Sequence, residues 1–120
     1  MKSQLDSFLG DNSSLTRTQI ERLMLQISLQ SPLALGEEES GSKISGVSPG
    51  AYYRVLSQAK NNIDQALYTV LFCTRIGVIQ MEELRRLLDL ISKAPPDVAN
   101  ADATQVMSLV DALVKRIVML

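Results

Sequence analysis

Few residues of this 120-residue chain have side chains suited to covalent or metal chemistry. The chain contains no histidine, which excludes histidine-dependent triads and the common histidine metal sites. Its single cysteine, Cys73, lies in an apolar run, which favours a small buried side chain over a reactive thiol. The acidic triplet Glu37–Glu39 is adjacent within a loop, so its carboxylates do not converge. We therefore expect a binding protein rather than an enzyme, with no cofactor and no metal.

A row of polar side chains follows Ser48 and is suited to hydrogen bonding. Ser48 is a good helix N-cap and Pro49 falls at the first helical position, so a helix is expected to start here. Apolar residues at helical spacing then turn inward: Tyr52, Val55, Leu56 and Ala59. The outward side of the same helix presents Gly50, Tyr53, Arg54, Ser57, Gln58 and Asn61, with Lys60 beside them.

The N-terminal part of the chain contains one clearly predicted helix. Thr16 and Gln19 have the spacing of a capping box, and an apolar face follows to about Leu29, ahead of Pro32. Residues 1–13 are expected to be a loosely ordered lead-in. Residues 31–46 are expected to be a glycine- and serine-rich loop, with at most one short helical turn between residues 35 and 40.

The helix that begins after Ser48 is expected to be the longest element. Its apolar stripe continues through Ile63, Leu67 and Leu71 to about Ile76, a length of about 40 Å at 1.5 Å per residue. Gly77 can then provide a left-handed C-terminal cap. Further helices are expected over residues 80–93 and from Asp102 onward. The sequence therefore predicts an all-α fold of four to five helices with a long central helix.

Residues 46–60, GVSPGAYYRVLSQAK, resemble the turn and recognition helix of a helix-turn-helix. In that motif a glycine takes the positive φ of the turn, an apolar residue enters the core, and a Ser or Thr caps the second helix. Gly46, Val47 and Ser48 match these three positions. The flanking segments are similar to sigma-factor region-four-like domains and related archaeal regulators. Residues 15–26, LTRTQIERLMLQ, resemble their opening helix, and residues 58–67, QAKNNIDQAL, resemble the exit of their recognition helix into a longer helix. The helix before the turn is degenerate, because its packing positions fall near Gly41, Ser42 and Ser45, with only Ile44 apolar.

The resemblance implies a DNA-binding transcriptional regulator whose recognition helix starts at Ser48. Arg54 would read guanine and Gln58 adenine through bidentate hydrogen bonds in the major groove. Ser48, the free N–H groups of the first turn, Tyr53 and Lys60 would hold phosphates. The alternative is a helical protein–protein interaction or scaffold module without nucleic acid, because exposed Tyr, Arg, Gln and Asn occur on many helices.

The overall charge does not favour nucleic acid, but its distribution is uneven. The net charge is -1, from 12 basic and 13 acidic residues, whereas nucleic-acid binders are usually basic. Residues 48–77 carry Arg54, Lys60 and Arg75 against Asp64 alone. The segment that resembles a recognition helix is therefore mildly positive.

The chain has the length of a single helical domain, 1–120, in which residues 14–63 form the helix-turn-helix-like part. Residues 64–120 are expected to continue the long helix and to add two helices for packing or dimerisation. The last helix carries more apolar residues than one buried stripe needs. We expect a homodimer through residues Val106–Leu120, and the alternative is that this helix folds back to complete the core of one chain.

Neither a secretion signal nor a membrane span is predicted. Residues 1–12 lack the apolar core of a secretory signal. The most apolar stretch, residues 66–79, is interrupted by Arg75 and Gly77 and is shorter than the roughly 20 residues that a span requires. A lone cysteine also fits a reducing compartment, so the expected location is the cytoplasm.

Overall fold

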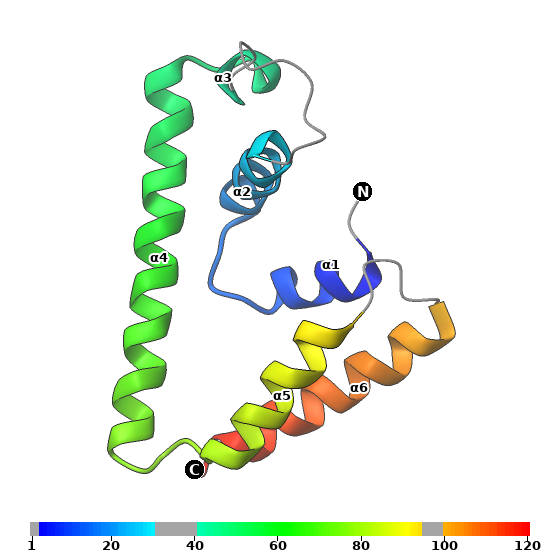
Figure 1. Ribbon diagram of the computed structural model, residues 1–120. Helices are drawn as coiled ribbons and strands as arrows, with labels where there is room; N and C mark the ends of the chain where they lie inside the picture. Colours follow the sequence, from blue (N-terminus) through cyan, green and yellow to red (C-terminus); the bar gives the residue numbers. More distant parts are fainter. Residues whose placement is uncertain (1–2, 31–40, 95–99) are drawn as a thin grey trace. The chain divides into compact units, whose positions relative to one another are not determined.

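The computed structural model describes residues 3–30, 41–94 and 100–120, and this part of the chain is helical (Figure 1). Apart from an isolated bridge between Ile79 and Val118, these residues include no strand. None of their helices is long and apolar enough to cross a membrane. The all-α class predicted from the sequence is confirmed. The helices are α1 (Gln4–Asp11), α2 (Arg17–Gln30), α3 (Gly41–Ser45), α4 (Pro49–Arg75), α5 (Met81–Lys93) and α6 (Asn100–Ile117).

Local capping signals explain where α2 and α4 begin and end. The Thr16 N–H donates to Gln19 Oε1 (3.1 Å) and the Gln19 N–H donates to Thr16 Oγ1 (3.2 Å), which is the reciprocal capping box predicted for α2. Ser48 Oγ accepts from the Ala51 N–H (3.3 Å) at the start of α4. Gly77 has a φ of 86° just past the end of α4, as expected for a left-handed cap.

Several local expectations differ from the structure. Residues 1–13 were expected to be loosely ordered, but they contain α1, whose N-cap Ser3 accepts from the Asp6 N–H (3.1 Å). Helix α6 begins at Asn100, so Asp102 lies in its first turn rather than at the N-cap. Cys73 is half-buried rather than fully buried. The short turn predicted between residues 35 and 40 and the acidic triplet lie outside the described residues, as do residues 95–99.

The chain forms two compact units. The terminal unit contains residues 1–13 and 67–120, and the unit 14–66 contains α2, α3 and the first part of α4. Helix α4 is one uninterrupted helix that contributes residues to both.

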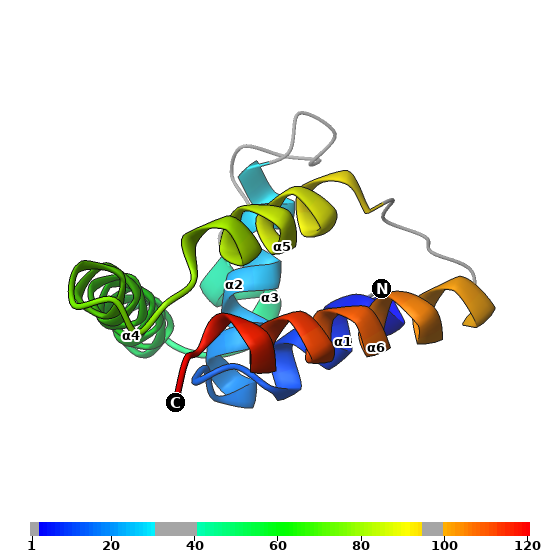
Figure 2. The same ribbon diagram turned by 90° about the horizontal axis from the view of Figure 1, so that it is seen from below.

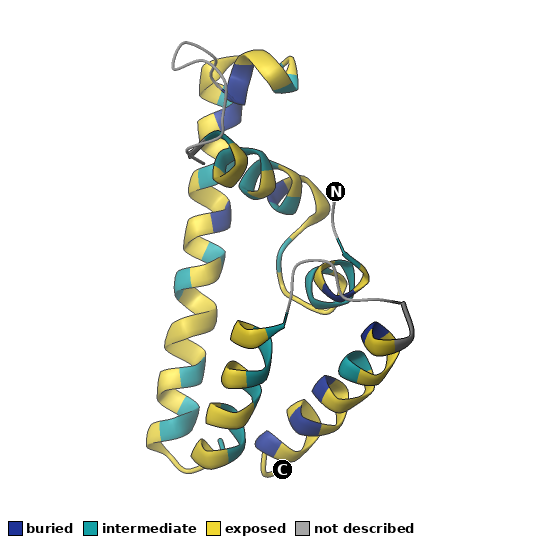
Figure 3. Cartoon of the chain, turned by 45° about the vertical axis from the view of Figure 1, so that its right-hand side comes forward, coloured by how far each residue is buried: buried dark blue, intermediate teal, exposed yellow. Residues whose placement is uncertain are grey.

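Helix α6 is the centre of the terminal unit, where it contacts both α1 and α5. Figures 1 and 2 show α5 and α6 alongside each other. Backbone hydrogen bonds join the segment before α5 to the end of α6. The Gln80 N–H donates to Ile117 O (2.8 Å), and the Met119 N–H donates to Val78 O (2.8 Å). Its buried apolar residues are Leu5 of α1 and Ala103, Val110, Leu113 and Ile117 of α6. Buried segments of the α6 ribbon are dark blue in Figure 3.

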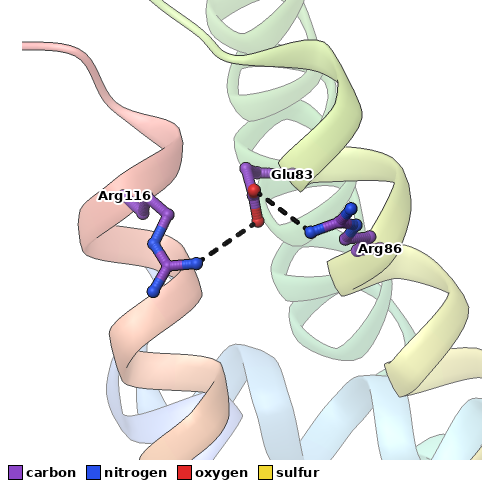
Figure 4. Close-up of polar contacts among 3 residues, drawn as sticks. All are labelled: Glu83, Arg86 and Arg116. Carbon is purple, nitrogen blue, oxygen red and sulfur yellow. Dashed lines mark hydrogen bonds and ion pairs between the residues drawn. The ribbon is translucent and has the colours of Figure 1, made fainter.

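A carboxylate from α5 lies between two arginines at the α5–α6 contact (Figure 4). Glu83 pairs with Arg86 on its own helix (3.4 Å) and with Arg116 of α6 (4.0 Å). The Glu83 side chain is only 14% exposed, and no described residue donates a hydrogen bond to its buried Oε2 atom. The pair links two helices, but loss of hydration at this oxygen offsets much of its attraction.

The apolar stripe of α4 is not buried along its whole length, contrary to the sequence prediction. Tyr52 and Ala59 are fully buried, whereas Ile63 is 38% and Leu71 64% exposed. Helical periodicity identified a continuous apolar stripe, but burial also requires a second element to pack on it. The exposed second half of α4 is visible as mostly yellow ribbon in Figure 3.

Candidate nucleic-acid interface

A glycine in the left-handed region and a serine cap join α3 to α4. Helix α3 ends at Ser45, and Gly46 follows with a φ of 75°, in the left-handed region that favours glycine. The Gly46 N–H donates to Ser42 O (3.1 Å), which closes the last turn of α3. Val47 is half-buried, and Ser48 then caps α4 through its hydroxyl. The positive φ of Gly46 and the Ser48 cap were both predicted from the sequence.

Tyr52 is the central packing residue of the unit 14–66. Its side chain is fully buried, and its hydroxyl donates to Gln26 Oε1 of α2 (2.9 Å). The guanidinium carbon of Arg22, also on α2, lies 5.9 Å from the centre of the Tyr52 ring, within the range of a cation–π contact. Burial is the main cause that raises the pKa of the Tyr52 phenol, and the neighbouring Tyr53 adds to it. Tyr52 thereby links α4 to α2.

Gly41 allows α3 to lie directly against the Tyr52 ring. A Cβ atom at this position would overlap ring carbons and the hydroxyl of Tyr52. Gly41 and its neighbour Ser42 are both buried, although α3 has only five residues. From the sequence alone, Gly41 indicates a degenerate helix before the turn. The structure shows a short helix in which the missing side chain makes room for a large aromatic ring.

Asn62 is a second position whose role was missed, because its partners are remote in sequence. Its Nδ2 donates to Ser14 O (2.8 Å) and to Gln19 Oε1 (3.2 Å). Its Oδ1 accepts from Ser14 Oγ (2.7 Å). Because Gln19 is also half of the α2 capping box, Asn62 attaches α4 to the start of α2. No local motif marks an asparagine for this role.

All the residues predicted to contact DNA are exposed. Inward burial of Tyr52 and Ala59 leaves the opposite side of α4 open along its first three turns. This open side carries a guanidinium, hydroxyls and amides, which are the groups used to hydrogen-bond base edges and phosphates. The exposed predicted residues are Ser48, Gly50, Tyr53, Arg54, Ser57, Gln58, Lys60 and Asn61.

The positive charge of Lys60 is shared with a neighbouring carboxylate. Lys60 Nζ lies 2.8 Å from Asp64 Oδ2, one helical turn further along α4. This hydrogen bond, with the attraction between the two charges, raises the pKa of Lys60 above its ordinary value of 10.5. Lys60 is therefore charged at neutral pH, but Asp64 partly neutralises its field. Arg54 is the stronger candidate for contact with an anionic ligand.

Comparisons of this chain with protein-family models, with curated proteins and with solved structures gave no match.

Proposed function

We propose that this protein binds duplex DNA through the first three turns of α4 and acts as a transcriptional regulator. The observation that supports this most is the arrangement from α3 through Gly46 and Ser48 to Tyr52. It fixes the start of α4 by packing on one side and leaves a polar row exposed on the other. A recognition helix needs both properties, because its side chains must reach base edges from a firmly held backbone.

The residues of the row divide by chemistry into two sets. Arg54 and Gln58 carry side chains able to form two parallel hydrogen bonds with guanine and adenine, respectively. Ser48, Tyr53 and Lys60 can donate to phosphate oxygens, together with the N–H groups of the first turn. Lys43 on α3 is also exposed and adds a positive charge to the described part of this unit. We place this binding activity in the cytoplasm and assign no catalysis, cofactor or metal to it.

An anisotropy titration with a fluorescent duplex of mixed sequence tests the proposal. At low salt the wild-type chain should bind, and Arg54→Ala should weaken binding about fivefold or more, because a base or phosphate contact contributes about 1–3 kcal/mol. The logarithm of the affinity should fall with the logarithm of the salt concentration with a slope of about -2 to -3, as expected for two or three phosphate contacts.

Arg85→Ala is the matched control, because Arg85 is an exposed helical arginine on α5 and its loss changes the net charge equally. It should bind duplex as the wild type does. Absence of binding at low salt with about 100 µM protein would contradict the proposal, since even non-specific binders associate in this range. Equal losses in the two arginine variants would show that only overall charge matters.

Regulators of this architecture commonly bind as two-fold dimers, so we also propose a homodimer. The sequence analysis placed its interface at Val106–Leu120, and that location stays a prediction. Within α6, Val110, Leu113 and Ile117 are buried against the rest of the terminal unit. Leu109 and Val114 remain 48% and 46% exposed and could still contact a partner.

A second candidate function is a protein-interaction module without nucleic acid. The observation that favours it is the exposed apolar surface on the second half of α4, where Tyr68 is 73% and Phe72 is 63% exposed. Large exposed apolar patches often mark interaction sites. If this second function is correct, a pull-down with this chain should recover a protein partner. Neither nuclease treatment nor Arg54→Ala should reduce the amount recovered.

A further inference from the structure

The second half of α4 carries a continuous exposed apolar face. No charged residue occurs between Gln65 and Thr74, a stretch of nearly three helical turns. Five large side chains on this stretch and just beyond it are between 55% and 73% exposed: Leu67, Tyr68, Leu71, Phe72 and Ile76. The described residues of the chain therefore leave this face of α4 uncovered.

Two opposite charges bound the apolar face. Asp64, Leu71 and Arg75 follow helical spacing and lie on the same side of α4, with Leu67 and Tyr68 between Asp64 and Leu71. The Asp64 side chain is 44% exposed. Arg75 is exposed, and no carboxylate among the described residues lies within ion-pair distance of it. At the other end Asp64 already pairs with Lys60 of its own helix (2.8 Å), so the face is apolar in the middle, positive at the Arg75 end and closed by an ion pair at the Asp64 end.

We propose that this face binds the same face of a second copy of the chain, with the two α4 helices antiparallel. An antiparallel pair centred between Thr69 and Val70 places Asp64 of each copy opposite Arg75 of the other. The same register places Tyr68 opposite Leu71 along the centre of the contact, with Leu67 and Phe72 on its two flanks. A parallel pair would instead place Arg75 opposite Arg75, which is unfavourable. The charges therefore favour the antiparallel direction.

The exposed area is sufficient for a weak dimer. If Leu67, Tyr68, Leu71 and Phe72 lose all of their exposed surface, about 500 Å² is buried per copy and about 1,000 Å² in total, the level of weak or transient interfaces. Association is expected at concentrations of about 100 µM and above. The overlap runs from Asp64 to Arg75, so it leaves the polar row at residues 48–61 outside the contact. Dimerisation through this face does not require DNA. The test for dimerisation and the test for duplex binding can therefore give different outcomes.

Light scattering and sedimentation over a range of protein concentrations test the pairing. The wild-type chain should approach twice its mass of 13.2 kDa. Leu71→Glu should remain a monomer, because it places a carboxylate at the centre of the interface. Leu88→Glu is the matched control, because Leu88 is a leucine of similar exposure (60%) on α5, and this variant should dimerise as the wild type does. Circular dichroism checks that the variants keep their helix content, and Leu67→Glu is a second variant of the same design.

Charge reversal tests the antiparallel register. Asp64→Arg and Arg75→Asp should each raise the dimer dissociation constant about tenfold, and the double variant should recover most of the loss, since it restores both pairs in the opposite sense. Asp89→Arg is the control, because Asp89 forms the same kind of exposed i,i+4 pair, with Lys93 at 3.1 Å, on α5. It should leave dimerisation unchanged.

Three outcomes would overturn the pairing. One is a wild-type chain that stays monomeric at about 1 mM, well above the concentration at which association begins for an interface of this area. Another is a well-folded Leu71→Glu variant that still dimerises, or a dimer that only Leu88→Glu disrupts. The third is a double charge reversal that associates no better than either single reversal.

Discussion

At the scale of single residues, Gly41 and Gly50 should respond oppositely to an added methyl group. In Gly41→Ala the new Cβ atom would overlap the Tyr52 ring, so we expect the free energy of unfolding to fall by about 1–3 kcal/mol. In Gly50→Ala the Cβ atom meets nothing within 4 Å, and alanine favours the helix by up to about 1 kcal/mol. Urea denaturation of the two variants measures both effects.

The comparison of the two glycines also distinguishes a general helix effect from a specific packing effect. A general preference for alanine in helices would stabilise both variants. Equal stabilisation would therefore contradict the close approach of α3 to Tyr52. A lower free energy of unfolding in Gly41→Ala but not in Gly50→Ala would support the close approach of α3 to Tyr52.

Tyr52 should make stability depend on pH in the alkaline range. Burial raises the pKa of its phenol in the folded state above the ordinary value of 10.0, so the folded state favours the neutral form. Its contribution to stability is complete below the pKa of the unfolded chain. It is lost as the pH rises through that value toward the folded pKa. Denaturation curves from about pH 8 to about pH 11 should show this loss in the wild type.

Tyr52→Phe is the control for the pH effect. It should be less stable at neutral pH by about 1 kcal/mol, because the hydrogen bond to Gln26 is gone. Its decline above pH 10 should be shallower than in the wild type, since the buried ionisable group is absent. Parallel declines in the two proteins would show that other groups cause the alkaline loss.

At the scale of elements, two adjacent asparagines of α4 should separate stability from DNA binding. Asn62 joins α4 to Ser14 and Gln19 through three hydrogen bonds, whereas Asn61 is exposed within the polar row. Asn62→Ala should lower the free energy of unfolding by about 1–2 kcal/mol. Asn61→Ala should change it by less than about 0.5 kcal/mol and should weaken duplex binding.

Thermal or urea unfolding and anisotropy titrations on the two asparagine variants check this division. The variants have the same composition, which removes differences in charge and helix propensity between them. Equal destabilisation by Asn61→Ala and Asn62→Ala would contradict this division. It would mean that the hydrogen bonds of Asn62 to Ser14 and Gln19 do not stabilise this turn of α4.

At the scale of the whole molecule, the unit 14–66 has no net charge of its own. Its sequence holds five basic and five acidic residues, although three of the acidic ones, Glu37–Glu39, lie outside the described residues. The field that a duplex meets depends on charges within about 10 Å, because salt screens more distant ones. The basic residues are Arg17, Arg22, Lys43, Arg54 and Lys60, and the acidic residues are Glu21, Glu37, Glu38, Glu39 and Asp64.

Only some of these cations are available to DNA. Arg17 pairs with Glu21 (3.7 Å), Lys60 pairs with Asp64, and Arg22 lies over the ring of Tyr52. Arg54 is exposed and is therefore the main cation of the polar row on α4. Weak affinity and a shallow salt dependence are therefore expected of a single chain, and a dimer would double the number of contacts.

The sequence by itself determined the features that depend on neighbours within a few residues. The Thr16–Gln19 capping box, the Ser48 cap and the positive φ at Gly46 are local, because each side chain or backbone angle acts on its own turn of the chain. The same reasoning identified the length of α4 and the outward row that starts at Ser48. The role of Gly41 and Asn62 could not be found in this way.

Only the tertiary structure decided which of the apolar residues are covered. Tyr52 and Leu71 belong to the same apolar pattern along α4, yet Tyr52 is fully buried and Leu71 is 64% exposed. Periodicity describes one surface of a helix, whereas burial requires a complementary surface brought there by distant parts of the chain. Gly41 and Asn62 owe their roles to that same kind of contact, with Tyr52 and with Ser14, which the spacing of residues along the sequence does not encode.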